Sequence, residues 1–249
     1  MPRTSAAPSI TEGTKSPEGL DLVTALLNQA KIETARSAVM IDTPATMAKV
    51  VDDLDGLPID PPSLYIDLEG ENLSREGTIS ILQLYLLLDD ARIPKVIFDV
   101  RNDSDALHTH YRVQLAGIQD LQLMELATRN FSRRHVNGLA RCIERDASLS
   151  LEENQQWKRC KDKGVHLFAP ERGGSYKVFN DRPLREEIRE YCVQDVHFLP
   201  RLWDCYNRKL SQTWRKKVTT ATMDRVGESQ SSSYVPHGQH KALAPLGWV

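Results

Sequence analysis

The clearest hydrophobic pattern lies in residues 63–70, which read Ser-Leu-Tyr-Ile-Asp-Leu-Glu-Gly. Successive side chains of a β-strand point to opposite faces, so the apolar residues of this run share one face. The polar ones, Asp67 and Glu69 among them, share the other. Two prolines before the run and Gly70 at its end delimit it. The pattern therefore predicts a short internal strand that carries two acids on one face.

Before this strand, apolar residues at helical spacing predict a helix over residues 20–36, and residues 39–42 predict a short strand. Thr43 is a good N-cap and Pro44 suits the first helical position, so a second helix should run to Leu54. After the strand, residues 78–85 are rich in β-formers and alternate at first. They are predicted to pair antiparallel with the first strand.

The rest of the chain alternates between strand and helix patterns. The predicted elements are strands over 94–100 and 117–121, and helices over 102–112, 124–129, 137–144 and 184–210. Pro200 should bend the last helix. The polar segment 146–180 contains a Gly-rich stretch, 171–175, that is predicted to be a loop.

Composition gives the domain boundaries. Residues 1–19 are rich in Ser, Thr and Pro and are predicted to be disordered, and 20–37 form the N-terminal helix. Residues 38–210 form the main domain, with a basic and then Ser-rich tail over 211–249.

Charge and cysteine content narrow the class of protein. The hydrophobic fraction of 40% and the charged fraction of 27% are typical of a globular chain. A net charge of -2 provides no global field for nucleic acid, so any such binding must use local basic patches. The four cysteines form no C-x-x-C pair, which favours a reducing intracellular compartment, cytoplasmic or nuclear. Since no apolar run or signal core is long enough, we expect no membrane association.

Two acidic patterns suggest chemistry. Asp67 and Glu69 would repel each other unless a cation lies between them or water solvates both. Mg²⁺ prefers oxygen ligands, so the pair could bind it; the alternative is a strand end exposed to solvent. Tyr191 and Asp195 are four residues apart and share a helix face, either packed inside or as a surface pair.

These patterns occur together in a known set. Asp67-x-Glu69 on a strand, Asp103 at a strand-to-helix junction and Tyr191-x-x-x-Asp195 on a late helix resemble the three motifs of DEDDy-type DnaQ-like 3′–5′ exonucleases. The similarity is greatest to the RNase D and Egalitarian-like group and spans residues 38–210. It implies an α/β fold of the RNase H-like type, with a mixed sheet flanked by helices.

The resemblance also implies two divalent metal ions, Mg²⁺ or Mn²⁺, on the scissile phosphate. Asp67 would contact both ions, Glu69 and Asp195 would complete the shell of one, and Asp103 would hold the other. Tyr191 would orient the attacking water. Asp105 is the alternative to Asp103, but it falls on a different helix face. Asp120 fits a family position near the site, and could equally be a helix cap.

The expected function is a metal-dependent 3′–5′ exonuclease acting on single-stranded 3′ ends, with RNA favoured over DNA by resemblance. The alternative is a catalytically weak or inactive exonuclease-like module that binds nucleic acid or a protein partner. Phosphate contacts could come from basic runs, each of which could also be a solvated face. The candidates are Arg133 and Arg134, and Lys158 and Arg159 in the run that continues to Lys161 and Lys163.

One departure from the family pattern lies between residues 84 and 94. The family places an antiparallel edge strand and a crossover helix here, whereas this chain joins the two flanking strands almost directly. The expected consequences are an exposed sheet edge and a less stable scaffold that could associate. The motif acids are unaffected.

Overall fold

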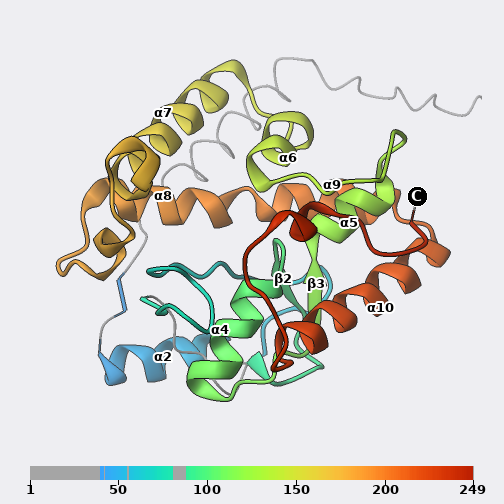
Figure 1. Ribbon diagram of the computed structural model, residues 1–249, viewed down its shortest axis with the longest axis horizontal. Coiled ribbons are helices and arrows are strands. Elements are labelled where there is room, and N and C mark those ends of the chain that lie inside the picture. The colour runs from blue at the N-terminus through green and yellow to red at the C-terminus, as the bar shows by residue number, and fades with distance from the viewer. Residues whose placement is uncertain (1–39, 42, 55, 81–87, 249) are drawn as a thin grey trace, which may run out of the picture. The chain divides into compact units, whose positions relative to one another are not determined.

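The computed structural model describes residues 40–41, 43–54, 56–80 and 88–248 (Figure 1). The chain divides into two units, Met1–Met40 and Ile41–Val249, and the second is described here. The expected N-terminal tail (1–19) and helix (20–37) lie outside the described residues. Part of the predicted strand over 39–42 does too, and Met40 and Ile41 have no regular secondary structure.

Helix α2 (Pro44–Leu54) begins where the sequence predicts. The Thr43 hydroxyl accepts a hydrogen bond from the Thr46 amide at 3.2 Å, as an N-cap residue does. After the helix, Gly56 adopts a φ of 77°, a conformation that glycine reaches without a steric cost.

The sheet consists of three parallel strands among the described residues. Their order is β1 (Leu64–Tyr65), β2 (Lys95–Ile97) and β3 (Ile118–Asp120). Val96 lies opposite Tyr65 on one side and Gln119 on the other. The predicted alternation holds in the run after Ser63, where the apolar side chains are buried and the polar ones half-buried. The strand itself is shorter than predicted and ends at Tyr65, so Asp67 and Glu69 follow the strand and do not lie on it.

Helices cover both faces of this sheet (Figure 1). Val96 packs in a core with α5 (Leu121–Thr128) and α9 (Leu199–Lys209). Ile97, its neighbour on β2, packs on the other face in a core with α4 (Arg101–Tyr111). Adjacent residues of one strand thus anchor two opposite layers.

The predicted antiparallel strand over 78–85 lies partly outside the described residues, and no antiparallel strand occurs in the part of the chain that the structure describes. The amides of Thr78 and Ser80 nevertheless donate to the carbonyls of Glu71 and Glu69, at 2.9 Å each, in antiparallel fashion. Gly70 permits this approach, because a β-carbon there would lie 1.9 Å from the Thr78 carbonyl oxygen.

The short connection into β2 is held by a buried lysine. The Lys95 ammonium donates to the carbonyl oxygens of Leu88 (3.3 Å) and Asp90 (2.7 Å). Burial lowers the pKa of Lys95 to about 8. Residues 89–94 contain neither a strand nor a helix, whereas residues 84–87 of the connection lie outside the described residues.

The helical half differs from the sequence prediction in two places. The polar segment 146–180, for which only a loop over 171–175 is predicted, contains a helix of 18 residues, α7 (Leu151–Phe168). The predicted helix over 184–210 is two helices, α8 (Glu186–His197) and α9, which meet at Phe198. Pro200 lies in the first turn of α9, where its missing amide costs no hydrogen bond, so it begins a helix and does not bend one. The remaining predicted helix of this half is α6 (Leu139–Asp146), after which come short 3₁₀ turns at Pro170–Arg172 and Tyr176–Asn180.

The expected C-terminal tail is also wrong. Helix α10 (Gln212–Ser229) packs against α4, α5 and β3. The C-terminal segment (residues 230–248) then returns past α4 and includes a 3₁₀ turn at Gln239–Ala242. Its Trp248 is 6% exposed and packs on Trp214 of α10, with ring centroids 5.1 Å apart. These contacts make residues 211–248 part of the folded domain.

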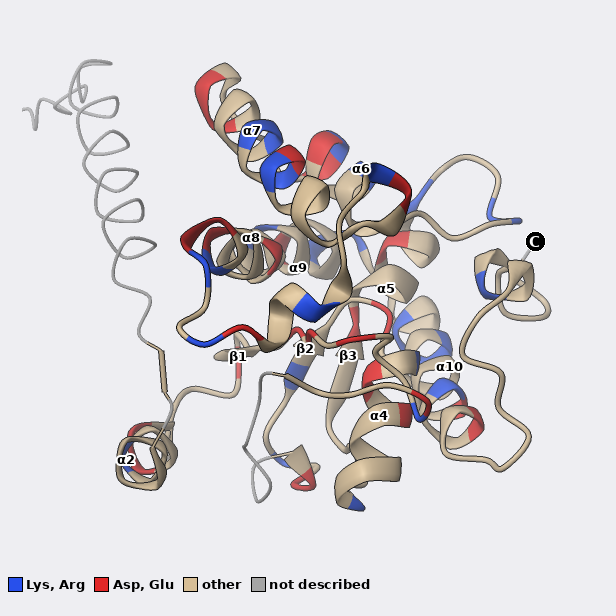
Figure 2. Ribbon diagram, turned by 60° about the vertical axis from the view of Figure 1, so that its left-hand side comes forward, with Lys and Arg blue, Asp and Glu red and all other residues tan. Residues whose placement is uncertain are grey.

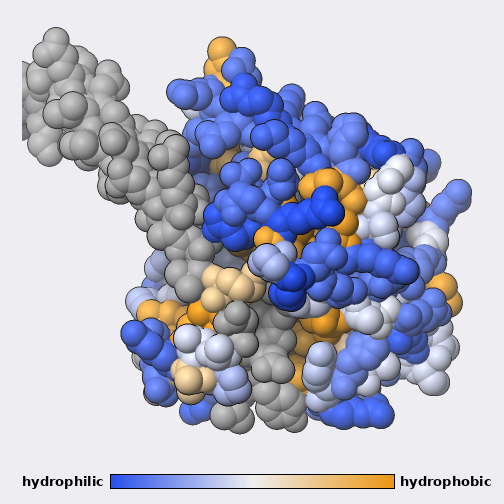
Figure 3. Space-filling model, turned by 90° about the vertical axis from the view of Figure 1, so that its left-hand side faces the viewer, coloured by the Kyte–Doolittle hydropathy of each residue, from blue (hydrophilic) through white to orange (hydrophobic). Residues whose placement is uncertain are grey.

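The face seen in Figure 3 is largely hydrophilic, with hydrophobic residues in separate patches. None of the helices that the structure describes combines the length and apolarity required to cross a membrane.

Candidate metal and nucleic-acid site

Acidic residues collect where the strands end. Asp67 and Glu69 follow β1, Asp103 lies in the first turn of α4 after β2, and Asp120 ends β3. Figure 2 shows acidic residues at these ends of the strands. In open sheets with parallel strands, ligands commonly bind beyond the carboxyl ends of the strands.

Asp67, Glu69 and Asp195 form one compact group, called the acidic group below. One carboxylate oxygen from each lies within 4.8 Å of the others. Asp195 comes from α8, where it is 6% exposed, and Tyr191 one turn earlier is 9% exposed. The two residues therefore face the interior, and the alternative of a surface pair does not apply.

Burial and mutual repulsion shift the pKa values of these acids upward. The pKa of Asp67 is raised to about 7, first by burial and then by the charge of Asp195. The pKa of Glu69 is raised to about 9, by burial and then by Asp67 and Asp195. Burial also raises the pKa of Asp195, against an opposing effect of Lys161. A cation among them would relieve this repulsion.

Asp103 and Asp105 differ in their surroundings. Asp103 is buried, and its pKa is raised well above the ordinary value by burial and by the charge of Asp67. It is not among the three acids whose oxygens lie together. Asp105 is instead paired with Arg75, whose guanidinium and backbone amide donate to it at 2.7 and 2.8 Å. Of the two, Asp103 is therefore the one with a carboxylate left to offer a ligand.

Tyr191 is held by packing. Its ring lies edge-on against Phe168, with centroids 5.0 Å apart. Burial and then the charge of Asp195 raise the pKa of its hydroxyl above the usual value. The group therefore stays protonated at neutral pH and can donate a hydrogen bond, but cannot act as a general base there.

The donor set fits a hard divalent cation. All three members of the acidic group offer carboxylate oxygens, the ligands that Mg²⁺ and Mn²⁺ prefer, and no nitrogen or sulfur ligand occurs in this group. The mutual repulsion of these acids, which Lys161 opposes only in part, supports the same interpretation.

Asp120, for which the sequence leaves two roles open, is a helix cap and an ion-pair partner. Its Oδ1 accepts from the amides of Gln122 (3.0 Å) and Leu123 (3.4 Å) at the start of α5. Its Oδ2 accepts from Arg225 of α10 at 2.7 Å. These bonds commit both oxygens to the scaffold.

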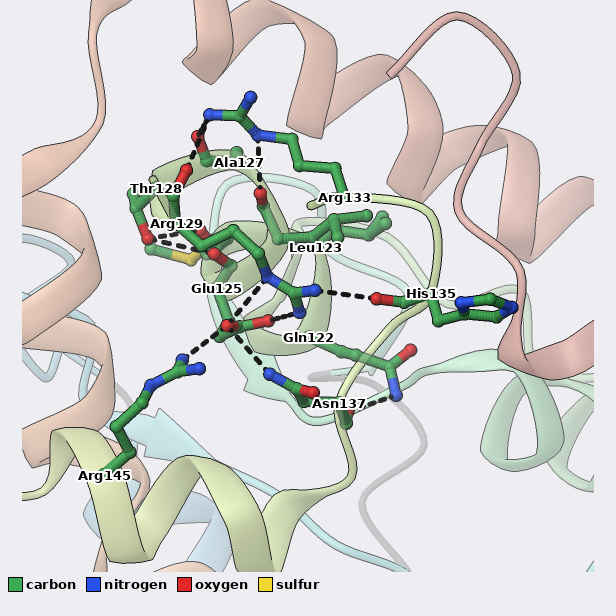
Figure 4. A network of polar contacts seen from close by, with 12 residues as sticks. Gln122, Leu123, Glu125, Ala127, Thr128, Arg129, Arg133, His135, Asn137 and Arg145 are labelled. Atoms are coloured by element: carbon green, nitrogen blue, oxygen red, sulfur yellow. Dashed lines mark hydrogen bonds and ion pairs between the residues drawn. The ribbon is translucent and has the colours of Figure 1, made fainter. Parts of the chain in front are cut away.

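The proposed phosphate-binding arginine Arg133 is engaged in the scaffold (Figure 4). Its guanidinium donates to the carbonyl oxygens of Leu126 (3.0 Å), Ala127 (3.4 Å) and Arg129 (2.7 Å) at the end of α5. It also lies over the Trp214 ring, 4.8 Å from the centroid. This arrangement argues against a phosphate contact, because those donors are used to satisfy a helix end.

The same figure shows how Glu125 anchors the loop that carries Arg133. The fully buried Glu125 carboxylate pairs with Arg129 and Arg145. It also accepts from the Asn137 amide at 3.2 Å. The loop is thus a structural element built around a neutralised buried acid.

The other basic candidates are on the surface. Arg134 and Arg159 are exposed, and Lys158 is 54% exposed and paired with Glu144 at 3.0 Å. The structure brings none of the three to the acidic group. It brings Lys161, from the same basic run, to within 3.6 Å of Asp195.

Sequence reasoning missed the element that carries Lys161. Helix α7 begins with a capping box in which Ser150 and Glu153 exchange hydrogen bonds. The S-x-x-E spacing is visible in the sequence and could have predicted the start of this helix. The same helix supplies Gly164, which faces Tyr191.

The chain is similar to solved structures of Trypanosoma brucei RNase D. The RNase D structure and its complex with RNA U12 each match with a TM-score of 0.63 and 20% sequence identity over 84% of this chain. The match covers 78% of the chain in the RNase D structure and 76% of the chain in the complex with RNA U12. The GMP complex matches with a TM-score of 0.52 and 22% identity, over 66% of this chain and 48% of that one. At these identities the likeness shows the fold alone, that of an RNase H-like exonuclease. None of the curated proteins matches the sequence.

A sequence profile described as 3′–5′ exonuclease matches residues 78–211. The match includes Asp103, Tyr191 and Asp195 but begins after Asp67 and Glu69, which reach the same site only in the folded chain. It covers more than half of the sequence, and the fold agrees with it. The chain therefore belongs to the 3′–5′ exonuclease family, with a DnaQ-like domain.

Proposed function

We propose that the protein is a metal-dependent 3′–5′ exonuclease that releases mononucleotides from single-stranded 3′ ends, with RNA favoured over DNA. The observation that carries the proposal is the acidic group, in which two carboxylates from the segment after β1 and one from α8 meet within 4.8 Å. Such a group is costly unless it binds cations. Family membership supplies the class of reaction.

The residues divide into two sets of ligands. Asp67, Glu69 and Asp195 would hold one Mg²⁺ or Mn²⁺, and Asp103 together with Asp67 would hold the second. Bound in this way, the ions supply an activated water, neutralise the phosphate charge and stabilise the leaving oxygen.

The protein's own contribution is to position groups around that site. Tyr191, protonated and packed against Phe168, presents a hydroxyl that orients the attacking water. Asp195 is fixed one turn away on the same face of α8, so that the hydroxyl and the carboxylate keep their relative placement. This is an orienting role and requires no proton transfer from Tyr191.

The preference for RNA is supported by one comparison. A structure with the same fold is a complex of Trypanosoma brucei RNase D with RNA U12. The net charge of -2 makes a large electrostatic footprint on a duplex unfavourable. A short single-stranded end requires fewer phosphate contacts, in keeping with the local basic groups of this chain.

The test is release of mononucleotides from a 5′-labelled single-stranded oligoribonucleotide with Mn²⁺ or Mg²⁺, with products resolved by length. We expect a descending ladder from the 3′ end, lost on chelation and lost in Asp67→Asn. Asp52→Asn, an exposed acid on α2, is the matched control and should keep activity. Binding of the oligonucleotide without cleavage by the wild type would assign a binding role, the alternative that the sequence leaves open.

A further inference from the structure

A single lysine of α7 faces the acidic group. The Lys161 ammonium lies 3.6 Å from Asp195 Oδ1, and its side chain is 25% exposed. It also lies over the Tyr191 ring, 5.3 Å from the centroid. Lys158, one turn earlier, pairs instead with Glu144 of α6 at 3.0 Å. The two lysines therefore have different surroundings although they belong to one basic run.

The position of Lys161 is set by tight helix packing. Gly164 lies one turn further along α7, and its Cα faces Tyr191 so closely that no β-carbon fits. This contact fixes the distance between α7 and α8 at the level of the acidic group. The backbone of Lys161 is therefore held in place, and its ammonium can move only by rotation of the lysine side chain.

The contact between Lys161 and Asp195 is a long ion pair. Charge-assisted hydrogen bonds are usually about 2.7–2.9 Å long, well below the 3.6 Å seen here. The ammonium is therefore not held by one short bond, and its charge acts on all three members of the acidic group, since it opposes the rise in the pKa of each. Cations bound by these acids would take over that role, and the three donors of the ammonium could then turn to another acceptor.

Charge balance indicates what that acceptor is. The acidic group and Asp103 bring four carboxylates, which two divalent cations would neutralise. A phosphodiester adds one further negative charge that these groups leave unbalanced. Lys161 supplies one positive charge at the edge of the group, beside the ring of Tyr191.

We propose that Lys161 binds the scissile phosphate, its ammonium donating to a non-bridging oxygen once substrate is present. The proposal rests on the proposed function and adds a substrate-binding residue to it. Lysine is well suited to this role because its ammonium acts as a point charge on a flexible stem. In the free protein the same ammonium rests beside Asp195.

The experiment measures binding and turnover separately. Affinity for a labelled single-stranded oligoribonucleotide is measured with Ca²⁺ at several salt concentrations, and cleavage with Mn²⁺. The variants are Lys161→Met and Lys161→Gln, which remove the charge, and Lys161→Arg, which keeps it. Lys158→Met is the control on the same helix. Melting curves show that each variant is folded.

We expect Lys161→Met and Lys161→Gln to raise Kd by about tenfold or more, the effect of losing one charge-assisted contact. The slope of log Kd against log salt should become shallower by about 0.7, the value for one lost phosphate contact on a single strand. Lys161→Arg keeps the charge and should have the Kd and the salt slope of the wild type. Lys158→Met should change neither the Kd nor the salt slope. A purely structural ion pair would not alter the salt slope.

Each outcome is informative. Unchanged Kd and salt slope in both uncharged variants would overturn the role of Lys161, while a wild type that still cleaves leaves the proposed function standing. A wild type that binds but never cleaves refutes the proposed function alone, and the salt slopes still decide on Lys161. If the wild type binds no oligonucleotide, both proposals fail.

Discussion

Gly164 of α7 lies against the ring of Tyr191 of α8, so closely that a β-carbon on Gly164 would come within 2.6 Å of Tyr191 Cδ2. No real β-carbon is found so close to another atom, so any larger residue must displace the ring or the helix. The glycine is thus part of what positions the tyrosine.

Gly164→Ala is accordingly expected to impair cleavage. Overpacking of this kind costs about 1–3 kcal/mol, and the displaced Tyr191 hydroxyl should lower kcat by about tenfold or more. The control is Gly227→Ala on the exposed face of α10, where a β-carbon meets no atom within 4 Å. That change should leave kcat unaltered and stabilise by about 0.5–1 kcal/mol. Equal kcat in both variants would show that the contact does not position Tyr191.

The neighbouring acids Asp103 and Asp105 should give opposite phenotypes. Asp103→Asn removes a proposed ligand and should lower cleavage by more than about a hundredfold, since even outer partners of metal sites cost ten- to hundredfold. It should not destabilise the metal-free protein, because it removes a repelled, buried acid. Asp105→Asn should instead weaken the bond to Arg75 and cost on the order of 2 kcal/mol, with cleavage kept in the folded fraction. Cleavage assays and urea unfolding distinguish the two residues, and exchanged phenotypes would reverse the assignment.

Stability of the metal-free protein should fall as pH rises. Asp67 and Glu69 have ordinary pKa values of 3.8 and 4.5, raised in the fold to about 7 and about 9. The folded state therefore binds protons more tightly than the unfolded state between about pH 4 and pH 9. Their contribution to stability is complete below pH 4 and is lost as pH approaches 9.

Mn²⁺ should reverse this trend, because ionised carboxylates bind metal better than protonated ones. The difference in Tm between Mn²⁺ and chelator should grow from pH 5.5 to pH 8.5. Asp67→Asn should reduce both the decrease in Tm with pH that is measured with chelator and the increase in Tm that Mn²⁺ produces. A Tm difference that does not vary with pH would contradict the pKa assignment.

Arg225 should be essential for stability, although it lies in the region predicted as a tail. Its guanidinium joins Asp120 (2.7 Å) and Asp99 (3.5 Å) and is 7% exposed. Arg225→Met leaves two acids without this partner and should cost about 3–5 kcal/mol, or roughly 10 °C in Tm. Arg208→Met, which breaks an exposed pair with Asp204, should change stability by less than about 1 kcal/mol. A Tm of Arg225→Met equal to that of the wild type would show that these ion pairs do not stabilise the fold.

Arg133→Ala should act on folding and not on binding. It removes three hydrogen bonds to carbonyl oxygens at the end of α5, which should cost about 1–3 kcal/mol. The affinity for an oligonucleotide and its salt dependence should not change. Arg134→Ala, at an exposed neighbour, serves as the comparison for both measurements. A shallower dependence of log Kd on log salt in Arg133→Ala would instead show that Arg133 contacts a phosphate.

The parts of the fold that the sequence predicts are those with a regular apolar pattern or a distinct cap. The alternation after Ser63 placed Asp67 and Glu69 on one face, and Thr43 and Pro44 marked the start of α2. Spacing of four also placed Tyr191 and Asp195 on one helix face, and the structure decides between the two alternatives left open there, since both residues are buried.

The sequence did not predict helices α7 and α10, because few residues of either helix are buried and those few do not form a regular apolar stripe. The buried residues of α7 are Trp157, Cys160 and Gly164. Those of α10 are Val218, Ala221, Thr222, Arg225 and Ser229. A periodicity argument needs apolar residues at helical spacing, and in α10 an arginine buried against acids takes the place of one. The partner of Arg225 lies about a hundred positions away, which no local pattern can show.

Arg75 shows how late in synthesis this domain can close. Its guanidinium donates to the carbonyl oxygens of Ser229 and Ser231, at 2.8 Å each and 154 and 156 positions later in the chain. Contacts between such distant positions form only after both partners exist, and a ribosome adds about 5–20 residues per second. A nascent chain thus spends several seconds with Asp67 and Arg75 already made and these contacts of Arg75 still missing. The bonds that tie Arg75, and through it Asp105, to the end of α10 can therefore form only after residue 231 has been made.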